Sequence, residues 1–116
     1  MSIEEEKRFV LLASLLDLGG HGRKHEVLDN IEAKGYLKLN DHDLEDMPSR
    51  NELYWRNDVA YVRKHLVANR CLDGARFNNW EITPKGQSYF RQLSATVVAE
   101  RFLHKLTPAA VRRASQ

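Results

Sequence analysis

The stretch that decides the fold is residues 50–70, RNELYWRNDVAYVRKHLVANR. Its apolar side chains recur at helical spacing and form one stripe suited to burial: Trp55, Val59, Val62 and Leu66. The stretch therefore predicts an amphipathic helix at the centre of the domain, with a polar and basic face turned away from the core.

That polar face carries side chains that suit a nucleic acid, namely Arg56, Asn57, Tyr61, Arg63 and Lys64. Asn and Arg can bond to adenine and guanine edges through two hydrogen bonds, Lys neutralises phosphate, and Tyr offers a flat apolar surface. A solvated helix face is the competing interpretation, because charged outer faces are common in globular proteins. The segments around the helix are needed to choose between the two.

Composition describes an ordinary globular chain of one domain. Of its 116 residues, 42% are hydrophobic and 29% are charged. No apolar run is long enough to span a membrane, and the start, MSIEEEKR, is acidic where a secretory signal would be basic. Cys71 is the only cysteine, which excludes an internal disulfide and favours a cytoplasmic location.

Charge is divided unevenly along the chain. Residues 1–58 carry 8 Lys and Arg against 13 Asp and Glu, whereas residues 59–116 carry 10 against 3. The net charges of the two halves are therefore −5 and +7. A basic half joined to an acidic half is the pattern expected when one side of a protein faces a polyanion.

Two helices are expected before the central one. Ser2 and Glu5 have the spacing of a capping box, and the first helix should end at Gly19 and Gly20. HGR at 21–23 should be extended. The second helix should span 24–33, with Val27, Leu28 and Ile31 turned inward and Gly35 as its stop. The connector that follows contains no more than one helical turn and leads through Pro48 to the central helix, and its acidity argues against contact with phosphates.

After the central helix the spacing of apolar residues changes from a helical to a strand-like period. Asp73 and Gly74 signal a turn, and Phe77, Trp80 and Ile82 are strand-like, so a hairpin with its tip within 73–79 is expected. Thr83 and Pro84 should begin a last helix that runs towards Leu106. Its apolar side comprises Tyr89, Phe90, Leu93, Val97, Phe102 and Leu106. We expect a domain over 1–106 and a basic tail over 107–116, which is either a short helix after Thr107 and Pro108 or disordered.

The predicted fold is mainly α with a small β-hairpin, a winged helix-turn-helix extended by a long C-terminal helix. In such a fold the third helix can enter the DNA major groove while the hairpin wing contacts the backbone or minor groove. The basic helix face and the polar hairpin tip would then point the same way, which favours DNA binding over a solvated face. The predicted DNA contacts are Arg50, Tyr54, Arg56, Asn57, Tyr61, Arg63, Lys64, Arg76, Asn78 and Asn79.

The segments NDVAYVRKHL and NNWEITPKGQSYF resemble the Mrr N-terminal winged-helix family of restriction systems. The resemblance covers about residues 8–93. The matching positions are Gly19, Gly20, the EVLDNI of the second helix, Asn57, Val59, Leu66, Trp80, Ile82, Thr83 and Gly86. Tyr61 stands where the family prefers Trp. Two positions differ from the family pattern: Asp58 replaces a family Arg, and Arg70 replaces the usual Gly before the hairpin. If the family Arg contacts DNA, Arg56 or Arg63 must compensate.

The resemblance implies partners. Related winged-helix domains are attached to nucleases, and some recognise DNA carrying N6-methyladenine, so a fused or partner nuclease and adenine-methylated duplex are expected. A methyl group in the major groove needs a small apolar or aromatic niche beside a side chain that reads adenine. Asn57 with Tyr54, Trp55 or Tyr61 is the candidate set, and burial of Trp55 in the core is the simpler role for that residue.

Other functions are weaker candidates. His21 and His25 are four apart with no third ligand nearby, so no metal site is expected, and Cys71 with His65 lacks a third orienting group. We therefore expect no catalytic residue, no cofactor and no enzyme activity. The main alternative is a protein-interaction scaffold without sequence-specific DNA binding, in which the long C-terminal helix forms a homodimer.

Overall fold

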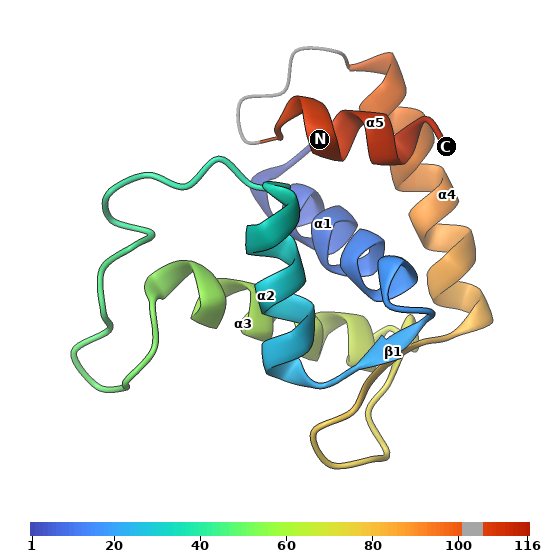
Figure 1. The fold of residues 1–116 in the computed structure, drawn as a ribbon. Coiled ribbons are helices and arrows are strands. Elements are labelled where there is room, and N and C mark those ends of the chain that lie inside the picture. Colours follow the sequence, from blue (N-terminus) through green and yellow to red (C-terminus); the bar gives the residue numbers. More distant parts are fainter. Residues whose placement is uncertain (101–105) are drawn as a thin grey trace.

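The computed structural model describes residues 1–100 and 106–116. The described residues form α1 (Ile3–Asp17), β1 (His21–Gly22), α2 (Lys24–Lys34), α3 (Tyr54–Ala68), β2 (Leu72–Asp73), β3 (Trp80–Ile82), α4 (Pro84–Ala99) and α5 (Pro108–Ala114). α1 packs against α2, α3 and α4 and forms the centre of the molecule (Figure 1). The predicted class is confirmed: the fold is mainly α with one small sheet, in the element order of a winged helix.

The central position of α1 follows from its wide apolar stripe. Every side chain from Phe9 to Leu15 is buried, including the hydroxyl of Ser14, which donates to the Val27 carbonyl at 2.8 Å and so ties α1 to α2. The predicted capping box begins the helix. Ser2 Oγ accepts from the Glu5 amide at 3.1 Å, and Glu5 Oε1 accepts from the Ser2 amide at 2.9 Å.

The hairpin joins β1 in a three-stranded antiparallel sheet with the order β1-β3-β2. Trp80 and Ile82 on β3 are buried, as predicted, and the tip of the wing spans residues 74–79. This tip lies within the expected range of 73–79. Phe77 was predicted as strand-like, and that prediction was wrong: β2 ends at Asp73, whose carboxylate accepts from the Ala75 amide at 2.8 Å, and β3 begins only at Trp80.

α3 buries its apolar stripe as the sequence predicts, but it begins at Tyr54 and not at Arg50. Leu53 at the N-cap offers no side-chain acceptor. Backbone carbonyls of the acidic connector take over that role: the Tyr54 amide donates to Glu45 O at 3.0 Å, and the Trp55 amide donates to Asp43 O at 3.2 Å. The connector therefore fixes where α3 starts.

α4 begins as predicted, with Thr83 Oγ1 accepting from the Gly86 amide at 3.0 Å, but it ends at Ala99. The prediction that it continues to Leu106 was wrong. Leu106 forms an isolated bridge with Leu37, in the segment after α2, which requires the chain to leave the direction of α4. Phe102, predicted on the apolar side of this helix, lies outside the described residues.

Two alternatives were considered for residues 107–116, a short helix or disorder, and the structure has the helix, α5. Thr107 Oγ1 accepts from the Ala110 amide, and Ala110 and Ala114 are buried. Arg113 Nε donates to Asp17 Oδ1 on α1 at 2.9 Å. α5 thereby packs across α1 and α4 at the opposite end of the molecule from the wing (Figure 1).

Candidate nucleic-acid interface

The structure divides the ten predicted DNA contacts into three groups. The first four line one groove beside α3, which we call the α3 groove: Arg50, Asn57, Tyr61 and Lys64. Three are engaged with other parts of the fold: Tyr54, Arg56 and Arg63. The remaining three lie on the wing: Arg76, Asn78 and Asn79.

The α3 groove has a volume of about 300 Å³ and lies between α3 and the end of the connector. Arg50 Nη1 donates to Asn57 Oδ1 at 3.1 Å, so the arginine orients the amide. Tyr61 is 57% exposed, and Lys64 is exposed with no ion pair to any residue in the described parts. The groove therefore combines a half-buried amide with a guanidinium, an ammonium and an aromatic ring that are exposed to solvent.

Sequence reasoning missed Ala60 of α3 and two further lining residues of this groove, Met47 and Ser49. Met47 and Ser49 belong to the connector, whose acidity argued against a place at the interface. The acidic run ends at Asp46, and the SRN that follows at 49–51 is neutral or basic. This change of charge is the signal that could have divided the connector into two parts.

Arg56 is engaged by α2. Its Nη2 lies 2.6 Å from Asp29 Oδ1 and 3.6 Å from Glu32 Oε1, and its side chain is only 20% exposed. The guanidinium also lies over the ring of Trp55, 5.1 Å from the centroid. Arg56 therefore joins α3 to α2 and stacks on the core tryptophan.

Arg63 and Tyr54 have similar structural roles. The guanidinium of Arg63 lies 5.6 Å from the ring centroid of Trp80 on β3, which connects α3 to the sheet. Tyr54 stacks on His42 of the connector with 4.2 Å between ring centroids. Trp55 is 1% exposed. Of the three aromatic residues considered for a methyl niche, Tyr61 alone is open to the α3 groove.

The wing is held against α2 and α3. Asn78 Oδ1 accepts from the Lys24 amide at 3.4 Å, and Asn79 Nδ2 donates to Glu81 Oε1 at 3.2 Å. A Cβ atom on Gly74 would lie 2.8 Å from Val67 Cγ1, so the backbone of the wing approaches α3 closely. Among the three predicted wing residues, Arg76 is the one whose side chain forms no hydrogen bond or ion pair with the described residues.

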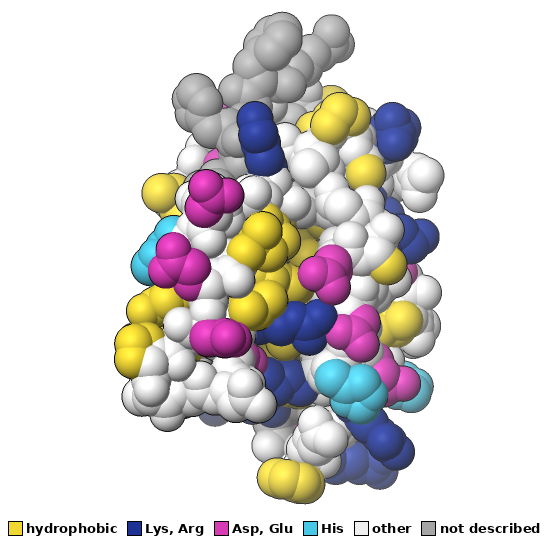
Figure 2. Space-filling view, turned by 60° about the vertical axis from the view of Figure 1, so that its left-hand side comes forward, with side chains coloured by type: hydrophobic (Ala, Val, Ile, Leu, Met, Phe, Trp, Pro, Cys, Tyr) yellow, Lys and Arg dark blue, Asp and Glu magenta, His cyan; other side chains and the backbone are white. Residues whose placement is uncertain are grey.

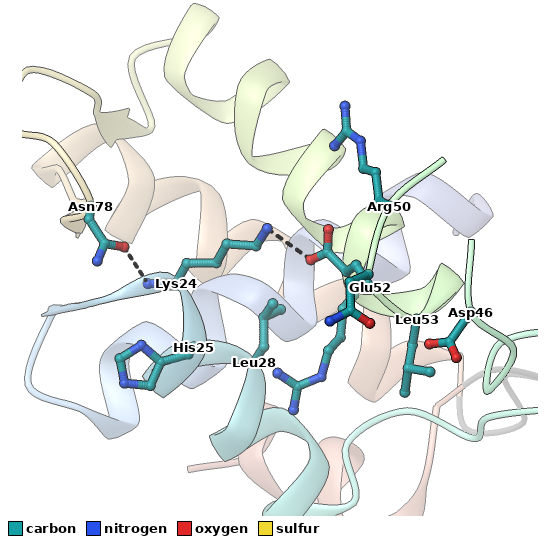
Figure 3. A pocket seen from close by; sticks show the side chains of 10 residues that line it. Lys24, His25, Leu28, Asp46, Arg50, Glu52, Leu53 and Asn78 are labelled. Atoms are coloured by element: carbon teal, nitrogen blue, oxygen red, sulfur yellow. Dashed lines mark hydrogen bonds and ion pairs between the residues drawn. The ribbon is translucent and has the colours of Figure 1, made fainter. Parts of the chain in front are cut away.

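A second groove, of about 540 Å³, separates the wing from the connector (Figure 3). Lys24 crosses this groove, and its Nζ lies 2.8 Å from Glu52 Oε1. Asn78 and Arg50 lie on opposite sides of the groove (Figure 3). Asp and Glu side chains border a hollow on the adjoining face, whereas Lys and Arg gather towards the lower end (Figure 2). Asp29 and Glu32 contribute to the acidic part of α2.

No competing chemistry emerges from the described residues. They contain no group of three or more His, Cys, Asp or Glu side chains that could hold a metal ion. Burial raises the pKa of the Cys71 thiol, which keeps it protonated and unreactive. His65 contacts Glu4 of α1 at 2.7 Å and not a nucleophile. None of the described helices has the length and apolar character needed to cross a bilayer.

The two departures from the family pattern have structural explanations. Asp58 Oδ2 lies 3.6 Å from Lys7 Nζ on α1, so position 58 faces α1 and not the α3 groove. Arg70 has a φ of 62°, the left-handed conformation in which glycine is favoured. The usual family Gly at that position therefore suits the turn that ends α3, and this chain retains the turn without it.

Comparison with known proteins identifies the domain. A family model described as the Mrr N-terminal domain matches residues 8–92, nearly the range that the sequence motifs indicated. No curated protein and no solved structure is significantly similar to the chain. The match spans more than half of the chain, from within α1 to within α4. This chain belongs to the Mrr N-terminal domain family.

Proposed function

We propose that this domain binds double-stranded DNA. Helix α3 enters the major groove, with the residues of the α3 groove facing the DNA, and the wing lies on the backbone. One observation carries the proposal: four side chains of complementary chemistry, three of them exposed and Asn57 half-buried, gather in a single groove on the outer side of α3. α3 and the wing lie on the same lower side of the molecule, away from α5 (Figure 1). Family membership supports this reading, because the Mrr N-terminal domain suggests DNA binding within a restriction system.

The residues of the groove have distinct roles in this proposal. Asn57 faces a base edge, where its amide can pair with adenine, and Arg50 both orients that amide and reaches towards the neighbouring base or phosphate. Lys64, exposed and without an ion pair in the described residues, neutralises a phosphate. Arg56 and Arg63 act through the fold, since their guanidinium groups are engaged by α2 and Trp80.

The proposal extends to the modification state of the DNA. Met47, Ala60 and Tyr61 line the same groove as Asn57 and provide apolar and aromatic surface beside the amide. A methyl group on adenine N6 would project into such a niche, while the remaining N6 hydrogen could still be donated to Asn57. We therefore assign N6-methyladenine as the preferred base, read for a fused or partner nuclease of the restriction system.

A salt titration tests DNA binding. Fluorescence anisotropy with a labelled mixed-sequence duplex should give an affinity that falls steeply with salt, because Arg and Lys displace counterions from the phosphates. Lys34→Ala is the matched control for Lys64→Ala, since Lys34 is an exposed lysine at the end of α2 that does not line the α3 groove. Absence of binding by the folded protein at low salt would exclude the proposal and leave the interaction scaffold.

A paired titration tests the modification. Two duplexes of one sequence set, with and without N6-methyladenine, should differ in affinity by about tenfold for the original protein, the effect of one well-fitted apolar contact beside a base. Tyr61→Ala should reduce that ratio, whereas Tyr54→Ala should retain it because Tyr54 stacks on His42. Equal affinities for both duplexes would remove methyl reading and leave general DNA binding.

A further inference from the structure

Phe77 at the tip of the wing is almost completely exposed to solvent. Its exposed fraction is 99%, against 59% for Ile3 and 57% for Tyr61, the next most exposed large hydrophobic residues of the described parts. An isolated aromatic ring in water contributes nothing to the core of this domain. The whole ring is therefore available for contact with a partner.

The tip that carries Phe77 is held in place on both sides. Before it, Asp73 Oδ1 accepts from the Ala75 amide at 2.8 Å, and Gly74 lies against Val67 of α3. After it, Asn78 adopts a left-handed φ of 51° and its Oδ1 accepts from the Lys24 amide at 3.4 Å. The ring is thus presented by a turn fastened to α2 and α3, which lowers the entropic cost of inserting it into a partner.

We propose that Phe77 is a wedge that inserts from the minor groove between two stacked base pairs and kinks the duplex. The inference rests on the proposed function, because the duplex must first be engaged by the α3 groove. The wing of a winged helix can reach the minor groove next to the major groove that holds the third helix. Proteins that bind there commonly insert an apolar side chain into a base step.

The neighbours of Phe77 suit this position. Arg76 precedes it, exposed and without a hydrogen bond or ion pair in the described residues, and a cation is attracted by the negative potential of a narrow minor groove. Unstacking of the base step is offset by burial of the ring, together with the additional protein surface that a bent duplex contacts.

Base unstacking provides the direct test. Duplexes that carry a fluorescent adenine analogue at successive steps should brighten at one step when the protein binds, and end-to-end energy transfer should show a bend. Phe77→Ala should abolish both signals and weaken binding about tenfold, whereas Phe77→Leu should retain part of each. Leu44→Ala is the control, because Leu44 is also exposed, at 49%, but lies in the acidic connector.

The outcomes separate the wedge from the proposed function. Salt-dependent binding with no brightening at any step, or with full brightening in Phe77→Ala, would overturn the wedge and leave DNA binding intact. No binding of any duplex by the folded protein would overturn both. Circular dichroism should show the same helix content for Phe77→Ala as for the original protein, since the ring contributes no buried surface.

Discussion

Arg56 and Lys64 are both cations on α3, two helical turns apart, and the structure uses them in opposite ways. Arg56 is held between Asp29, Glu32 and the ring of Trp55. Lys64 lines the α3 groove and is exposed. The first stabilises the packing of α3 on α2, and the second is available to a polyanion.

The two flanks of α3 differ in the same way as these two residues. On the inner flank of α3, Arg56 faces α2, where two carboxylates and the ring of Trp55 contact its guanidinium, and Arg63 faces the sheet, where its guanidinium contacts the ring of Trp80. The outer flank, with Asn57, Tyr61 and Lys64, faces the α3 groove. A basic residue on an amphipathic helix is therefore no evidence of a ligand site until its neighbours from other elements are known.

Gly86→Ala should have the largest effect on stability, because the added methyl group would clash with the backbone that leads into the wing. A Cβ atom there would lie 2.1 Å from the Cys71 carbonyl oxygen, a backbone atom that cannot move without displacing the hairpin. We expect a loss of about 3 kcal/mol in the free energy of unfolding, measured by urea denaturation. Gln87→Ala, at an exposed position on the same turn, should change stability little. Equal stability of both variants would contradict the close approach.

Arg56→Ala should lower stability by about 1.5 kcal/mol, because it removes two carboxylate contacts and the stacking on Trp55. The salt dependence of DNA binding should remain that of the original protein, since Arg56 contacts no phosphate. Urea denaturation and anisotropy titrations measure the two quantities. A shallower salt dependence at unchanged stability would place Arg56 on the outer flank of α3 and would show that Arg56 and Lys64 have the same role.

Lys64→Ala should show the reverse pattern. Its affinity for duplex should fall about fivefold at low salt, and the slope of log affinity against log salt should become shallower by about 1, the loss of one phosphate contact. Stability should be unchanged, because the side chain is exposed. A salt titration in parallel with Lys34→Ala measures the difference. Identical slopes for the two variants would show that the α3 groove does not face phosphate.

Arg70→Gly should have the smallest effect, a stabilisation of about 0.5 kcal/mol. Glycine relieves the left-handed backbone at φ 62°, although it adds entropy to the unfolded chain. Asn69→Gly is the control and should destabilise, because Asn69 has an ordinary φ of −85°. Thermal unfolding measures both changes. A decrease in stability for Arg70→Gly would mean that its side chain, and not its backbone, matters to the fold.

The sequence predicted best those features that depend on neighbours along the chain. The capping box of Ser2 and Glu5, the glycine stop at Gly35 and the Thr83-Pro84 start of α4 are all present, because each involves residues within one helical turn. The buried stripe of α3 was likewise predictable, since a period of 3.6 residues places four side chains on one face. Motifs spread over α3 and the hairpin were sufficient to indicate the family.

The errors concern contacts between distant segments. Phe77 was predicted as strand-like, but β2 ends at the Asp73 turn and β3 begins only at Trp80. The end of α4 was missed because Leu106 pairs with Leu37 and not with its helical neighbours. The intramolecular contacts of Arg56 and Arg63 were not predicted, because their partners come from α2 and β3.

The sequence was sufficient for the starts of α1, α2 and α4, the buried face of α3 and the family of this domain, because hydrophobic period, caps and turn residues act over a few positions. Tertiary structure alone decided which cations remain free. Packing of α2 beside α3 pairs Arg56 with carboxylates and leaves Lys64 in an open groove, and the fastened wing leaves Phe77 in solvent. The physical reason is that a charge or an aromatic ring is satisfied by whatever lies near it in space, and spacing along one helix does not contain that information.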